Sequence, residues 1–129
     1  MKKIFVVSVL MMLAIVLSSC GMTDSRLNGD WYLSEIHSKI TNTFWKPDRS
    51  EEISFSRYFL KEISKYQDGK EHNLRFRYEI IHKEDDGGSF YSSIPGDSKK
   101  DLYAYIFEDN KLILYRDDPT GLYYVYLRK

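Results

Sequence analysis

The chain contains little cysteine and little proline, and neither sign of charge is in excess. One cysteine, Cys20, occurs among 129 residues, so the fold contains no internal disulfide and must be held by core packing. The 19 basic residues are matched by 19 acidic ones. Without a basic excess, nucleic acid is not an expected partner.

The first twenty residues have the order of a secretory signal peptide. Lys2 and Lys3 precede an apolar segment from Ile4 to Leu17, and two serines and Cys20 follow it. The apolar segment is 14 residues long, which is short of the roughly 20 residues that a membrane-spanning helix needs. We therefore expect a cleaved leader rather than a membrane span.

The sequence Leu17-Ser18-Ser19-Cys20 resembles the lipobox of bacterial lipoproteins. The resemblance implies cleavage before Cys20 and a lipid, such as palmitate, on its thiol. Residues 1–19 would then be the signal peptide, residues 20–26 a lipidated tether, and residues 27–129 the folded domain. The implied location is the cell envelope, on the outer membrane if the cell is Gram-negative.

Aromatic residues and turn signals predict an all-β domain. The chain has 11 tyrosines, two tryptophans and seven phenylalanines against three prolines, and no long helical pattern. Such side chains suit pleated, half-buried surfaces. Alternating segments separated by short turns predict about eight antiparallel strands, which can close into a small barrel without exposed edges. A half-open barrel or a sandwich is the alternative.

Two hairpins are predicted with their registers. Asp68-Gly69 is typical of a two-residue turn, which places Phe59 opposite Tyr78 and Lys61 opposite Phe76. Asp109-Asn110 predicts a second hairpin, in which Tyr105 faces Leu114, Phe107 faces Leu112 and Tyr103 faces Arg116. Residues 37–50 are expected to form a loop with aromatic anchors, and residues 84–89 a flexible acidic loop.

The start of the domain is similar to that of the lipocalin family, in which a Gly-x-Trp motif opens the first strand. Gly29 and Trp31 match that motif, and Arg128 on the final strand matches the late arginine that packs over the tryptophan. A cation over an indole ring contributes about 0.5–2 kcal/mol. The chain is thus predicted to be a lipocalin-like barrel, with Gly29, Trp31 and Arg128 in structural roles.

The lipocalin resemblance implies an internal cavity for a small apolar ligand. The predicted register of the first hairpin points Phe59, Phe76 and Tyr78 into the barrel. Lys61 would lie on the same face, where it either pairs with a ligand carboxylate or extends to the barrel rim. The alternative is a barrel filled by its own side chains, acting as a protein-interaction lipoprotein such as an envelope assembly factor, an enzyme inhibitor or an immunity protein. The candidate ligand-binding residues are Trp31, Phe59, Lys61, Phe76, Tyr78 and Tyr105.

No catalytic residue, metal site or cofactor is predicted, so the chain is not expected to be an enzyme. His72 and His82 lie ten positions apart, roughly 33 Å along a strand, and cannot share an ion. Glu51 and Glu52 point to opposite faces of a strand and make a poor acid/base pair. The expected partners are the membrane, through the lipid on Cys20, and either a small apolar ligand or a protein.

Overall fold

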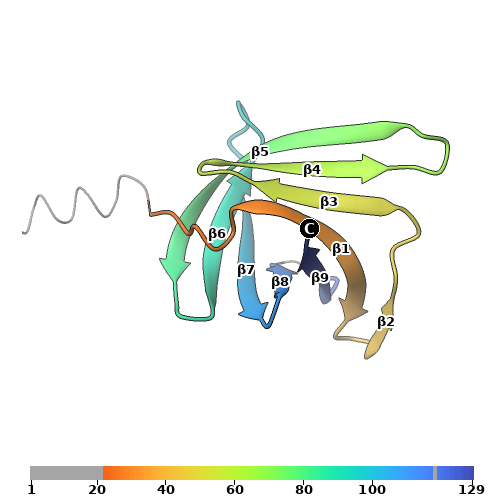
Figure 1. The fold of residues 1–129 in the computed structure, drawn as a ribbon. Coiled ribbons are helices and arrows are strands. Elements are labelled where there is room, and N and C mark those ends of the chain that lie inside the picture. Colours follow the sequence, from red (N-terminus) through yellow and green to blue (C-terminus); the bar gives the residue numbers. More distant parts are fainter. Residues whose placement is uncertain (1–21, 118) are drawn as a thin grey trace, which may run out of the picture.

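The computed structural model describes residues 22–117 and 119–129, and these form an antiparallel β-barrel (Figure 1). The predicted signal peptide and Cys20 lie outside the described residues. Within the described part of the chain, no helix is long and apolar enough to cross a membrane. The all-β barrel predicted from the sequence is confirmed.

Eight strands close the barrel, and a ninth short strand lies beside the first. Each of the eight pairs with its neighbours, and β1 closes the ring by pairing with β9, while β2 pairs only with β1. The strands in chain order are β1 Gly29–Ser38, β2 Thr43–Trp45, β3 Ser50–Phe55, β4 Phe59–Lys65, β5 Glu71–Lys83, β6 Gly87–Ser93, β7 Asp101–Glu108, β8 Lys111–Arg116 and β9 Leu122–Arg128.

The two ends of the barrel differ, and we call them the capped end and the mouth. The capped end holds the segment 22–28, the turns 56–58, 84–86 and 109–110, and Lys129, whose N–H donates to the carbonyl of Asp30. The mouth holds the connections 39–42, 46–49, 66–70 and 94–100, and residues 117 and 119–121. In Figure 1 the segment before β1 reaches the barrel beside β5 and β6.

The core fills the middle and the capped end of the barrel. Trp31, Phe90, Tyr105 and Leu112 are at most 2% exposed, and Leu27 closes the capped end from inside. The indole N–H of Trp31 donates to the carbonyl of Leu27 over 2.9 Å, which satisfies its one buried polar atom. The apolar interior is therefore filled by the side chains of the barrel itself.

The expected contact of Arg128 with Trp31 is present. The guanidinium carbon of Arg128 lies 4.1 Å from the indole centroid, and Trp31 pairs with Arg128 across β1 and β9. Gly29 opens β1 with a φ of +118°, a conformation that L side chains rarely adopt. A Cβ at this position would also lie 3.1 Å from Nη1 of Arg128.

The predicted two-residue turn at Asp68-Gly69 is wrong by one residue. The structure pairs Lys65 with Glu71, and the N–H of Tyr66 donates to the carbonyl of Lys70, so three residues form the loop. Gly69 has a φ of +84° at the last loop position, where a three-residue hairpin needs a left-handed residue. A slip of one residue exchanges the two faces of a strand.

This exchange turns two predicted inward residues outward. Phe59 pairs with Arg77 and Lys61 pairs with the exposed Arg75, so the prediction that Phe59 and Lys61 face the interior is wrong. Leu60 takes the inward position and is 3% exposed. The consequence for the mouth is that Glu62, next but one along β4, also points inward.

The second hairpin and the loops near it give a mixed outcome. Tyr105 pairs with Leu114 as predicted, and Asp109 has a φ of +55° in the turn. The flexible loop expected at 84–89 is wrong, because Gly87 and Gly88 belong to β6. The loop expected at 37–50 is interrupted by β2, which contains Phe44.

Candidate functional site

A polar cavity lies inside the mouth, and we call it the mouth cup. It has a volume of about 220 Å³. Strands β3, β4, β7, β8 and β9 contribute its walls. Its lining residues are Glu51, Glu52, Glu62, Ser64, Tyr103, Leu114, Arg116, Tyr124 and Tyr126.

The β-strand alternation explains why polar side chains reach this cavity. Leu60 is buried on β4, so Glu62 and Ser64 follow it on the same face. In the same way Arg116 follows the buried Leu112 and Leu114 along β8. Each strand therefore changes from apolar to polar as it leaves the core, and the change forms the floor of the mouth cup.

Glu62 is the unusual group of the mouth cup. Burial, and to a smaller extent the nearby Glu51, raise the pKa of its carboxyl, while Arg116 acts to lower it. Within residues 22–117 and 119–129, no side chain donates a hydrogen bond to Glu62 or forms an ion pair with it. The two charged neighbours are both engaged: Arg116 lies 3.3 Å from Asp101, and Glu51 lies 2.7 Å from Arg49.

Tyrosines form the remaining wall of the mouth cup. Burial raises the pKa of Tyr103 to about 12, and it raises the pKa of Tyr126 well above its usual value. These hydroxyls are therefore neutral at physiological pH and can donate or accept hydrogen bonds. Their rings, with that of Tyr124, offer flat surfaces to a ligand.

A second cleft adjoins the mouth cup under the β2–β3 connection. It has a volume of about 430 Å³, and it shares Glu51 and Tyr124 with the mouth cup. Its apolar wall comes from Ile36, Trp45 and Pro47, and its polar wall comes from Lys46, Asp48 and Arg49. We call it the side cleft. The two cavities are therefore neighbours at the mouth, with Glu51 and Tyr124 lining both.

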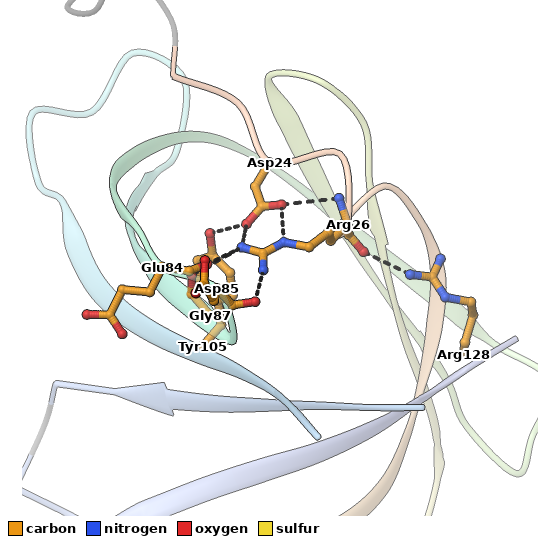
Figure 2. A network of polar contacts seen from close by, with 7 residues as sticks. All are labelled: Asp24, Arg26, Glu84, Asp85, Gly87, Tyr105 and Arg128. Atoms are coloured by element: carbon orange, nitrogen blue, oxygen red, sulfur yellow. Dashed lines mark hydrogen bonds and ion pairs between the residues drawn. The ribbon is translucent and has the colours of Figure 1, made fainter. Parts of the chain in front are cut away.

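A network of polar contacts fixes the N-terminal segment at the capped end (Figure 2). The side chain of Asp24 is fully buried; it accepts hydrogen bonds from Nε and Nη2 of Arg26 at 2.8 and 2.7 Å, and from the hydroxyl of Tyr105 at 2.6 Å. Arg26 also donates to the carbonyls of Glu84, Asp85 and Gly87. We call Asp24, Arg26 and Tyr105 the latch.

Because of the latch, the packed part of the chain begins at Asp24, before Leu27. Burial acts to raise the pKa of Asp24, but the hydrogen bonds from Arg26 and Tyr105 outweigh it and hold that pKa below its usual value. Arg128 adds hydrogen bonds to the carbonyls of Arg26 and Asn28. Residues 24–26, which were expected to belong to a tether, are thus tied to the barrel.

A row of stacked rings crosses the outer face of β2, β1, β9 and β8, and we call it the aromatic row. His37 stacks between Phe44 and Tyr123, with ring centroids 5.2 and 4.8 Å apart, and Tyr123 stacks on Tyr115 at 5.1 Å. The Lys39 ammonium lies 4.5 Å from the Tyr115 centroid. The Phe44 end of the row is 62% exposed.

The six predicted ligand residues do not form one site, although Phe59 and Tyr78 line the same groove. Trp31, Tyr78 and Tyr105 are buried in the core, and Phe76 packs against it. Phe59 lines a separate groove of about 380 Å³ on the outer face of β4–β6 with Arg77 and Tyr91, and Lys61 is exposed.

The residues of the mouth cup were missed by the sequence reasoning. One signal for them was available, because the predicted hairpin correctly places Tyr103 opposite Arg116 at the end away from the turn. Comparisons with family models, with curated proteins and with solved structures find no match to this chain. The candidate site is therefore defined by its geometry.

Proposed function

We propose that this chain is a lipid-anchored envelope lipoprotein whose barrel binds a small ligand at its mouth. The observation that carries the proposal is Glu62, a half-buried carboxylate that faces a cavity and has no hydrogen-bond or ion-pair partner among the described residues. Its oxygens are accessible to solvent through the cavity, since every fully buried side-chain oxygen or nitrogen of the described residues has a hydrogen-bond partner. A ligand group in the mouth cup would take the place of this water and pair with the carboxylate.

The geometry favours the mouth over the apolar interior as the ligand site. The interior residues predicted to contact an apolar ligand are packed in the core, where Tyr78 and Tyr105 each contact Phe90 with ring centroids 5.6 and 5.9 Å apart. The mouth cup, in contrast, is open to solvent and polar. Its volume lies below the roughly 300 Å³ of pockets for drug-sized molecules, which favours a small ligand.

The latch supports a defined orientation of the anchored barrel. Cys20 precedes the buried Asp24 by four positions, and four residues span at most about 14 Å. A lipid on Cys20 would therefore hold the capped end at the membrane surface. Because the mouth lies at the opposite end of the strands, it would face away from the bilayer and toward soluble ligands.

Replacing Cys20 by Ser tests the anchor. The variant is expected to leave the membrane fraction, because serine has no thiol to carry the lipid, while the melting temperature of the barrel stays unchanged. Fractionation of cells and labelling with a radioactive or clickable fatty acid measure this. Ser19→Ala, which keeps a small residue before the cysteine, serves as the control. A Cys20→Ser protein that remains in the membrane fraction would disprove the lipid anchor.

A screen of small molecules by nuclear magnetic resonance tests the ligand site. The protein is the chain from residue 20 with Cys20→Ser, since residues 22–129 contain the whole barrel and its core. We expect some charged or polar fragments to shift the amide signals of Glu62, Tyr103 and Arg116 and to leave those of the capped end in place. A screen without such shifts would contradict the ligand site. It would favour the second candidate function, protein recognition through the exposed end of the aromatic row.

A further inference from the structure

We propose that the mouth cup and the side cleft bind an amphipathic amine, with its ammonium group at Glu62 and its apolar body along Trp45. This inference rests on the proposed function, because it names the class of ligand for the same site. It follows from the charges of the mouth cup, from the character of its walls and from the side cleft that lies next to it.

The charge in the mouth cup favours a cation. Glu62 on β4 and Glu51 on β3 both face the cavity, and Ile53, next but one to Glu51, pairs with Glu62 across the two strands. Arg116 is the cationic side chain among the lining residues of the mouth cup, and it already lies 3.3 Å from Asp101. A positive group beside Glu62 would supply the partner that this carboxylate lacks, whereas an anionic group would be repelled.

The walls suit an organic cation better than a metal ion. Tyr103, Tyr124 and Tyr126 surround the cavity with rings, and ammonium groups are attracted to aromatic faces. A hard metal ion instead needs several oxygen ligands that converge on one point. Among the described residues, no group of three acidic, histidine or cysteine side chains is placed to hold a metal ion.

The side cleft provides the place for an apolar body. It shares Glu51 and Tyr124 with the mouth cup, so we place the apolar body of a ligand whose head lies at Glu62 in this neighbouring cavity. Trp45 is 44% exposed there, beside Ile36 and Pro47. Covering these side chains removes apolar surface from water and adds to the affinity. A short amine with one apolar or aromatic body matches both parts.

The experiment compares three probes with the same phenyl ring and three-carbon chain on the chain from residue 20 with Cys20→Ser: 3-phenylpropan-1-amine, 3-phenylpropan-1-ol and 3-phenylpropionate. We expect the amine to bind with shifts at the mouth, the alcohol to bind at least about tenfold more weakly, and the acid to bind least. Glu62→Gln should weaken the amine at least about tenfold and leave the alcohol unchanged. Glu108→Gln, an exposed carboxylate at the capped end of β7, is the matched control and should change nothing.

The outcomes separate this inference from the proposed function. If the alcohol or the acid binds at the mouth as tightly as the amine, or if Glu62→Gln leaves the amine unaffected, the mouth remains a ligand site but the ammonium assignment is overturned. If none of the probes and none of the screened fragments shifts signals at the mouth, both proposals fail. Glu62→Gln is expected to fold, because it removes a charge that burial disfavours.

The affinity for the amine should also depend on pH. The ionisable groups that line the mouth cup with Glu62 are Glu51, Glu52, Arg116 and the tyrosines at 103, 124 and 126. Burial raises the pKa of Glu62 and of the hydroxyls of Tyr103 and Tyr126, so the two tyrosines stay neutral while Glu62 gains a proton as the pH falls. Binding should weaken as the pH falls through the raised pKa of Glu62, and Glu62→Gln should flatten this profile. An affinity that stays constant from pH 8 to pH 4 would overturn the inference.

Discussion

Replacing Asp24 by Asn is expected to lower the free energy of unfolding by about 3 kcal/mol, because it breaks a buried ion pair and leaves Arg26 without its carboxylate. This loss lies at the low end of the range expected when a buried ion pair is broken, because the side chain of Arg26 is 33% exposed. Urea titration followed by tryptophan fluorescence measures the change. Asp86→Asn, in the exposed turn nearby, is the control and should change stability by less than about 0.5 kcal/mol.

The pH dependence gives this prediction a second readout. The folded-state pKa of Asp24 is lower than its usual value of 3.8, so its stabilising effect is fully present above that value and is lost as the pH falls through the folded pKa. The difference between the native chain and Asp24→Asn should therefore be constant from pH 5 to pH 8 and shrink below about pH 4. A difference that is already absent at pH 7 would show that the latch does not stabilise the barrel.

Replacing Gly87 by Ala is expected to destabilise the barrel by at least about 3 kcal/mol. A Cβ on Gly87 would lie closer than 3.0 Å to the carbonyl oxygen of Tyr105 and 3.1 Å from the Cα of Ile106. Both are backbone atoms of β7, to which β6 is paired, so no flexible side chain can move aside. The strands must separate, and the carbonyl of Gly87 that accepts from Arg26 moves with them.

Gly96→Ala is the matched control for this substitution. Gly96 has a φ of +89°, but no atom lies within 4 Å of a Cβ built on it. Alanine there should cost about 1–2 kcal/mol from backbone strain alone. Thermal unfolding and the yield of soluble protein compare the two variants. A soluble Gly87→Ala protein that is as stable as Gly96→Ala would contradict the close packing of β6 on β7.

The features that the sequence predicts correctly depend on short-range chemistry or on a single strong pairing. The hairpin around Asp109-Asn110 has a turn in which Asp109 takes a positive φ, and its register follows directly. The contact between Trp31 and Arg128 joins two ends of the chain, and the family resemblance supplied it. Such features do not require knowledge of how the other strands are staggered.

The hairpin around Asp68-Gly69 shows why the candidate site was missed. Asp-Gly fits both a two-residue turn and a three-residue loop that ends in a left-handed glycine, and the two differ by one position of register. The structure adopts the three-residue loop, so Glu62 points into the barrel in place of Lys61. One ambiguous turn therefore reversed the sign of the charge expected inside the mouth.

The latch was missed for a different reason. Asp24 and Arg26 are charged residues close to the predicted lipid attachment, and such residues are usually solvated. Their burial depends on Tyr105 and on the turn at 84–86, which lie about 60 to 80 positions away in the chain. No local pattern encodes a contact of that range, so only the assembled barrel reveals it.

Because β2 lies outside the closed ring of strands, the closure of the barrel and the shape of the side cleft depend on different parts of the chain. The ring of hydrogen bonds closes from β1 directly to β9, while β2 is attached to β1 by the pairs of residues 36–38 with 43–45. Yet the stretch 39–49 carries Trp45 and Pro47, the apolar wall of the side cleft. Insertions and substitutions in residues 39–49 can therefore change the shape of the side cleft without breaking the closed ring of paired strands. Binding preference can thus diverge in evolution while the scaffold stays the same.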